Sequence, residues 1–357
     1  MTKTTQPTSG ASAPDFREAS ISKLPALHLL QNLGWQYLTP AEALELRGGR
    51  AANVLLEGVL LPWLRDHNHI AYKEKVIPFS EGNILSAVQA LRAVPFDGLV
   101  RTNEAVYDLL CLGKSLQQAI DGDTKSFPIR YIDWDNPGNN LFHVTEEFTV
   151  ERTGSHQIRR PDLVLFVNGI PFVVIECKSP TGKDPLGEAV SQSIRNQKEN
   201  EIPPLFFYAQ LLLALSKNEA KYGTVGTPAK FWSVWREESE GFEDALKRLI
   251  NIPLSETQID RLFVENEWIA RPPSVREGAA SFSGIIRNIT EQDRTIYALC
   301  RPDRLLELVF RFILFDAGVR KVARYQQYFC VRKIMDRIKV RKHDGARAAR
   351  VHRPDHD

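Results

Sequence analysis

The chain has 357 residues, which is long enough for two or three domains. Of these residues 43% are hydrophobic and 25% are charged, and the formal net charge is +2, which is the composition of a globular protein. Its longest apolar runs, such as residues 163–167 and 211–215, are far too short to cross a membrane. The four cysteines show no CxxC spacing, which argues against a zinc site or a disulfide framework. The N-terminus lacks the apolar core of a signal peptide. Together these features indicate a cytoplasmic protein.

The N-terminal part is expected to be disordered at first and then mainly helical. Residues 1–15 are polar and carry no hydrophobic pattern, which predicts a disordered lead-in. Apolar positions at helical spacing over residues 16–33 predict a helix that ends at Gly34. Further helices are predicted near residues 51–65 and 84–91.

The middle of the chain changes to strand-like composition. Residues 126–178 are rich in β-branched and aromatic side chains separated by Asn, Gly and Pro, which predicts several strands. Helices are predicted at residues 186–196 and 205–216, and a short strand at residues 229–237. This order of elements predicts an α/β layer domain with a mixed sheet, spanning residues 16–250.

The C-terminal part divides into three predicted segments. Residues 251–280 are punctuated by proline and form a connector, residues 281–339 are helical, and residues 340–357 form a disordered basic tail. Residues 320–357 carry twelve Lys and Arg against four Asp and Glu. Such a basic end can contact nucleic acid, although a charge run is more often a solvated face.

A charged cluster ends the hairpin predicted at residues 161–178. Asp162, Glu176 and Lys178 have the spacing PD-x13-ExK. Two carboxylates can share Mg²⁺, with the backbone carbonyl of Cys177 as a third ligand. Lys178, on the same strand face as Glu176, can orient or help deprotonate a water and stabilise charge on a phosphate. The hairpin therefore predicts a magnesium-dependent phosphodiesterase site; the alternative is a buried structural ion pair between Glu176 and Lys178.

The register of this hairpin gives a geometric test. Asn168-Gly169 is a strong turn signal. A two-residue turn with an unbroken ladder would pair Asp162 with Ile175, and Asp162 and Glu176 would then point to opposite faces. A shared metal requires both carboxylates on one face. We therefore predict an odd loop or a β-bulge, with Gly169 at positive φ.

With these residues in view, the chain resembles the N-terminal nuclease domain of the restriction (R) subunit of type I restriction–modification enzymes, over about residues 16–338. Six segments carry the resemblance in the expected order: LGWQYL, NNLFHVTEEFTVER, RRPDLVLFVNGIPFVVIECKSP, IRNQKENEIPPLFFYAQLLLA, KYGTVGTPAKFWSVWRE and RYQQYFCVRKI. The resemblance implies the PD-(D/E)xK fold, a restriction-endonuclease-like mixed central sheet flanked by helices. It also implies a Mg²⁺-dependent endonuclease that acts on double-stranded DNA with methylase and specificity subunits as partners.

The family's site residues carry over at matching positions. Asp162 and Glu176 would bind the metal, and Lys178 would be the catalytic lysine. The family's QxxxY element aligns with Gln192, which would contact the DNA backbone or the lysine, and with Asn196, where many relatives have Tyr. An acid on an upstream helix often assists in such nucleases, and Glu18 is the nearest candidate.

The intact family subunit continues into an ATP-driven translocase with two RecA-like lobes. Residues 281–339 resemble the start of that motor, and Gln326 and Gln327 resemble its adenine-side element. The chain holds no G-x-x-x-x-G-K-[ST] loop, so we expect a truncated or frame-shifted subunit without ATP-dependent translocation, ATP being a cofactor of the intact subunit only. Two functions stay open: an endonuclease domain, or a fragment that binds DNA or partner subunits without cleaving. A stand-alone ATPase is disfavoured.

Overall fold

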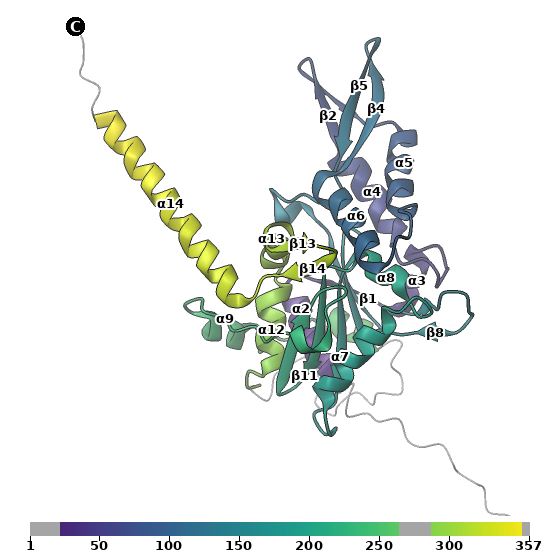
Figure 1. Ribbon diagram of the computed structural model, residues 1–357, viewed down its shortest axis with the longest axis vertical. Coiled ribbons are helices and arrows are strands. Elements are labelled where there is room, and N and C mark those ends of the chain that lie inside the picture. The colour runs from purple at the N-terminus through teal and green to yellow at the C-terminus, as the bar shows by residue number, and fades with distance from the viewer. Residues whose placement is uncertain (1–21, 264–286, 352–357) are drawn as a thin grey trace, which may run out of the picture.

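A six-stranded mixed sheet forms the centre of the protein (Figure 1). The computed structural model describes the main chain of residues 22–263 and 287–351, and the side chains of residues 22–262 and 287–338. Neighbouring strands are parallel at β1–β6 and β10–β11 and antiparallel at the other three pairings. The strands, in sheet order, are β1 (Gln36–Leu38), β6 (Phe142–Glu146), β9 (Leu163–Val167), β10 (Ile170–Lys178), β11 (Leu211–Ser216) and β12 (Glu219–Gly223). The predicted α/β architecture with a mixed sheet is confirmed.

Helices cover both faces of this sheet. On one face, α7 (Pro185–Asn196) packs against β10 and β11. On the other face, α2 (Leu24–Asn32) packs against α12 (Glu291–Cys300), which also contacts β11 and β12. Because both faces are covered, all residues of β9 and β11 are buried.

The remaining elements before residue 264 surround this core. Two hairpins, β2–β3 and β4–β5, project from it together (Figure 1) and are joined by a 2.6 Å hydrogen bond from Tyr72 to Asp123. The sequence did not predict these hairpins. The elements are α3 (Pro40–Leu46), α4 (Glu57–His67), β2 (His69–Tyr72), β3 (Lys75–Pro78), α5 (Glu81–Arg92), α6 (Leu99–Leu112), β4 (Lys114–Ile120), β5 (Asp123–Ile129), β7 (Val150–Glu151), β8 (Ile158–Arg159), α8 (Pro203–Tyr208), α9 (Phe242–Leu249) and α10 (Glu256–Phe263).

The second half of the nuclease region differs from the sequence expectation. Residues 205–216 form the end of α8 and the buried strand β11, whereas one helix was predicted. The leucines of β11 have helical propensity, but their place between β10 and β12 overrides it. The strand predicted at residues 229–237 is wrong as well, since this segment forms a 3₁₀ turn (Ala229–Phe231) and a single bridge from Ser233 to Tyr222.

The segment from residue 287 onward first packs on the same core and then extends away from the core as a helix. It forms α12, α13 (Pro302–Phe312), β13 (Ile313–Asp316), β14 (Val319–Val322) and α14 (Tyr325–Val351). The hairpin β13–β14 interrupts the segment predicted to be helical, and its buried Arg320 donates hydrogen bonds to Asn103 and Gln210. α14 then projects from the body (Figure 1).

Two predicted irregular segments contain helix. α14 runs to Val351, where disorder was expected from residue 340, because Ala and Arg in this stretch are strong helix formers. The predicted connector at residues 251–280 contains α10. The lead-in at residues 1–15 and Glu18 lie outside the described residues. Among the residues that the structure describes, no helix is both long enough and apolar enough to span a membrane.

Candidate active site

A β-bulge in the β9–β10 hairpin sets the register of the candidate site. Asn168 and Gly169 form the turn with φ of 52° and 81°. The register then shifts between Pro171 and Val173, which leaves Phe172 as the extra residue of a bulge. Beyond the bulge the ladder is regular up to Ile175 opposite Leu163, so the next pair brings together Asp162 and Glu176. The predicted bulge and the positive φ of Gly169 are confirmed.

Asp162 lies immediately before β9 and is held by the end of β10. Its Oδ2 accepts a 2.7 Å hydrogen bond from the main-chain N–H of Cys177 and lies 3.9 Å from Nζ of Lys178. The side chains of Asp162 and Lys178 are each 16% exposed, so solvent reaches the site from their side. The structure thus brings Asp162, Glu176 and Lys178 together on one face of the hairpin.

Glu176 is fully buried and is held from α7. Oε2 accepts a 2.7 Å hydrogen bond from the amide of Gln192, and Oε1 accepts a 3.2 Å bond from the amide of Asn196. Burial raises the pKa of Glu176 well above its usual 4.5, and the contact and charge of Asp162 raise it further, whereas Lys178 lowers it. Two carboxylates that disfavour each other's charge in this way form a site that a cation would stabilise.

Gln192 and Asn196 are four residues apart, so they lie on the same face of α7. Gln192 was expected to contact the DNA backbone or Lys178; in the structure its amide donates a hydrogen bond to Glu176. The contact of Asn196 was not predicted. Its signal was the spacing itself, because a helix places positions 192 and 196 against the same strand residue.

A buried lysine lies on the opposite face of the sheet, beneath the end of β6. Nζ of Lys23 is 3.0 Å from Glu146 and 2.7 Å from Glu147, and Tyr37 donates a 2.8 Å hydrogen bond to Glu146. The main-chain N–H of Glu147 donates to the carbonyl of Asp162 at 3.0 Å. The ion pairs therefore fix the strand end beside which Asp162 lies, an arrangement that the sequence analysis missed.

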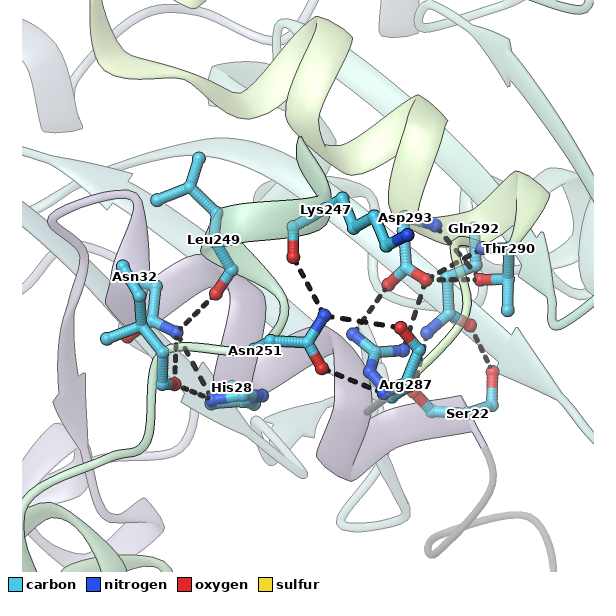
Figure 2. A network of polar contacts seen from close by, with 11 residues as sticks. Ser22, His28, Asn32, Lys247, Leu249, Asn251, Arg287, Thr290, Gln292 and Asp293 are labelled. Atoms are coloured by element: carbon cyan, nitrogen blue, oxygen red, sulfur yellow. Dashed lines mark hydrogen bonds and ion pairs between the residues drawn. The ribbon is translucent and has the colours of Figure 1, made fainter. Parts of the chain in front are cut away.

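A polar network holds the start of α2 in this position (Figure 2). Ser22 donates a 2.6 Å hydrogen bond to Gln292 of α12 and accepts one in return at its carbonyl, 2.8 Å long. Further along α2, Asn32 donates to the carbonyl of Leu249 at 2.9 Å. Segments from three parts of the chain thus support the face of the sheet behind the candidate site.

The donor set bears on the kind of ion that the site can hold. Among the described residues, no group of three or more His, Cys, Asp and Glu is arranged to hold a metal. Asp162 and Glu176 provide two carboxylates, which suits Mg²⁺, since this ion is usually bound by one or two carboxylates and keeps several waters. It does not suit zinc, which takes three or four protein ligands.

Comparison with known proteins agrees with the resemblance noted from the sequence. The family described as "Type I restriction enzyme R protein N terminus" matches residues 15–231, more than half of the chain. The chain belongs to this family.

Curated relatives carry matching names. A "Putative type I restriction enzyme MjaIXP endonuclease subunit" of Methanocaldococcus jannaschii is 26% identical over 335 residues, which are 91% of this chain and 28% of the relative. The "Type I restriction enzyme HindI endonuclease subunit" of Haemophilus influenzae is 26% identical over 329 residues, 90% of this chain and 26% of the relative. The chain thus spans about a quarter of the length of these relatives.

Proposed function

We propose that this chain hydrolyses phosphodiester bonds of double-stranded DNA with Mg²⁺, as the nuclease part of a type I restriction R subunit with the PD-(D/E)xK, restriction-endonuclease-like fold. The observation that carries the proposal is the bulge at Phe172, because it brings Asp162, Glu176 and Lys178 to one face. A hairpin with an unbroken ladder would have separated the two carboxylates.

Asp162 and Glu176 would hold the Mg²⁺, with the carbonyl of Cys177 as a third ligand. The N–H and C=O of a strand residue point toward the same neighbouring strand, and the N–H of Cys177 is bonded to Asp162, which supports this ligand role. Each oxygen of Glu176 accepts one amide hydrogen bond and keeps a further lone pair for a metal. Bound there, Mg²⁺ would polarise a phosphoryl oxygen and lower the pKa of a bound water.

Lys178 would act on the attacking water and on the phosphate. Its ammonium lies beside Asp162 and is partly exposed, so it can stabilise negative charge that develops on the phosphate oxygens. Gln192 and Asn196 act through Glu176, whose carboxylate they fix by two hydrogen bonds. They are therefore positioning residues in this proposal.

The proposal includes partners and a cellular location. Both relatives described above are named endonuclease subunits, which supports a complex in which other subunits supply methylation and DNA specificity. ATP would serve the motor of an intact subunit. A cytoplasmic location is supported by the four cysteines, all of which are free thiols.

Cleavage of supercoiled plasmid with Mg²⁺ tests the function. The wild-type chain is compared with Asp162→Ala and Lys178→Ala, and with Lys183→Ala as a control at an exposed lysine in the loop after β10. We expect nicking by the wild type and the control, and its loss in the other two. Equal activity in all four would show that the site is wrongly assigned. A wild type that binds DNA but leaves it intact would favour the non-cleaving alternative.

A further inference from the structure

A two-stranded ribbon extends from the sheet at Asp162. Glu146 of β6 pairs with Leu163 of β9, and Val150 of β7 pairs with Arg159 of β8, in one continuous register. The ladder is interrupted only around Glu147, which has a φ of 47°, and Asp162. β7 and β8 are therefore the outer part of the β6–β9 hairpin, and they project at the side of the body (Figure 1).

Glu201 holds this ribbon to the other half of the candidate site. Its carboxylate is 2.6 Å from Nε of Arg159 and 3.3 Å from Nε of Arg152, and its side chain is only 8% exposed. Its carbonyl accepts a 2.8 Å hydrogen bond from the N–H of Thr153. Glu201 lies in the loop after α7, the helix that carries Gln192 and Asn196. The ribbon is thus fixed relative to both sides of the site.

The ribbon and this loop carry cations without a carboxylate partner. Arg160 is exposed and lies two residues before Asp162, and its side chain forms no hydrogen bond or ion pair with any residue that the structure describes. The side chain of Lys198, exposed in the loop after α7, likewise has no hydrogen-bond or ion-pair partner among the described residues. The tip of the ribbon, residues 153–158, is exposed as well. Two exposed cations therefore lie near the candidate site, one on the ribbon and one in the loop after α7, where they could pair with more than one phosphate.

We propose that the β7–β8 ribbon with Arg160 is the element that seats duplex DNA at this site, an inference that rests on the proposed nuclease function. The ribbon lies along a groove of the duplex, whose major groove admits a two-stranded β-ribbon. Arg160 contacts a phosphate that neighbours the scissile one, because only Pro161 separates it from Asp162. Glu201 is a positioning residue, since it sets the place of the ribbon through Arg152 and Arg159.

The salt dependence of DNA binding tests the role of Arg160. Binding of a 30-base-pair duplex is followed by fluorescence anisotropy between 50 and 200 mM salt, with the 357-residue chain carrying Asp162→Ala to prevent cleavage. Each phosphate contact adds about 0.9 to the slope of log K against log salt, so adding Arg160→Ala should lower the slope by about that amount. Arg65→Ala, at an exposed arginine paired with Glu81 on α4 and α5, is the control with the same charge change and should leave the slope unchanged.

An unchanged slope in the Arg160 variant, an equal fall in the Arg65 variant, or no binding by the chain would each overturn this inference. Plasmid cleavage by the wild type and by Asp162→Ala distinguishes failure of the DNA-binding inference from failure of the nuclease proposal. If the wild type cleaves and Asp162→Ala does not, the nuclease function holds whatever the slope shows. Without cleavage by the wild type, the nuclease proposal fails, and with it the placement of DNA at Asp162.

Glu201→Gln separates positioning from binding. The substitution removes a negative charge and frees Arg152 and Arg159, so equilibrium binding should stay equal or become tighter. The single-turnover cleavage rate should nevertheless fall at least tenfold, because the ribbon no longer holds the DNA in place. A parallel fall of binding and cleavage, or unchanged cleavage, would contradict the positioning role.

Discussion

The main-chain N–H of Cys177 donates a 2.7 Å hydrogen bond to Oδ2 of Asp162. The end of β10 thus holds the side chain of Asp162, which stands opposite Glu176 in the hairpin. Because both residues belong to one hairpin, the geometry of the two carboxylates depends mainly on the register of that hairpin. This relationship predicts which substitutions keep the fold and which disturb it.

Asp162→Asn should abolish cleavage and leave the fold intact. The amide oxygen can still accept from Cys177, but the charge that raises the pKa of Glu176 is gone, so the pKa of Glu176 should fall. We therefore expect the thermal midpoint of the metal-free variant at pH 7 to equal or exceed that of the wild type, while plasmid cleavage with Mg²⁺ is lost. A clearly lower midpoint would mean that Asp162 is mainly a structural residue.

Stability should depend on pH through Glu176 when no metal is present. Its pKa is raised in the folded chain above the ordinary 4.5, so the folded state binds this proton more tightly than the unfolded state. The corresponding stability is present below pH 4.5 and is lost as pH rises from there toward the folded-state pKa. Thermal midpoints of the wild type in EDTA should therefore fall with pH relative to Glu176→Gln, which lacks the titrating group.

Mg²⁺ should reverse this loss at neutral pH, since it binds the charged carboxylates of the folded chain only. The rise in midpoint should be absent in Glu176→Gln and in Asp162→Asn. An equal rise in all three proteins would place the ion elsewhere.

The catalytic hairpin could be predicted from the sequence because its signals are local. Asn168-Gly169, the buried strands and the parity of Asp162 and Glu176 together required a bulge near the turn. The supporting contacts could not be predicted in the same way. Lys23 meets Glu146 across 123 positions of sequence, and Ser22 meets Gln292 across 270, so only the folded core brings them together. The prediction for the residues of β11 was wrong for a related reason: its leucines favour a helix, and only the two flanking strands of the folded sheet make them a strand.

Asn196→Ala should weaken both the site and the fold. The change removes a hydrogen bond to a fully buried carboxylate oxygen, and an unsatisfied buried polar group costs about 1–3 kcal/mol. Urea unfolding should show a loss in this range, and cleavage should need more Mg²⁺ because Glu176 is less well placed. Ser191→Ala, at an exposed position of the same helix, is the control and should change neither quantity.

Lys23→Met should destabilise the strand end behind Asp162. Burial lowers the pKa of Lys23, but its pairs with Glu146 and Glu147 raise it overall, so the ammonium is charged in the fold. Its removal leaves Glu146, 2% exposed, without its cation, at a cost of roughly 3 kcal/mol. The double variant Lys23→Met/Glu146→Gln should regain part of this free energy of unfolding. Additive losses in urea unfolding would show that the pair is not coupled.

Gly169→Ala should test how closely the hairpin turn approaches α4. Gly169 has a φ of 81°. A Cβ added there would lie 2.4 Å from the carbonyl oxygen of Leu56. The N–H of Leu56 in turn donates a hydrogen bond to the carbonyl of Gly169. Gly122, in the β4–β5 turn, has a similar φ of 84° with nothing within 4 Å of the added atom, so Gly122→Ala measures the backbone strain alone.

We expect Gly122→Ala to cost about 1 kcal/mol and Gly169→Ala about 1–3 kcal/mol more, because the latter must also displace the first turn of α4. The turn is linked to the bulge by only two residues, so the same displacement should reduce plasmid cleavage in Gly169→Ala and leave it unchanged in Gly122→Ala. Equal losses of stability in the two variants would show that the backbone of α4 does not constrain the turn. In that case the register of Asp162 and Glu176 would depend on the bulge alone.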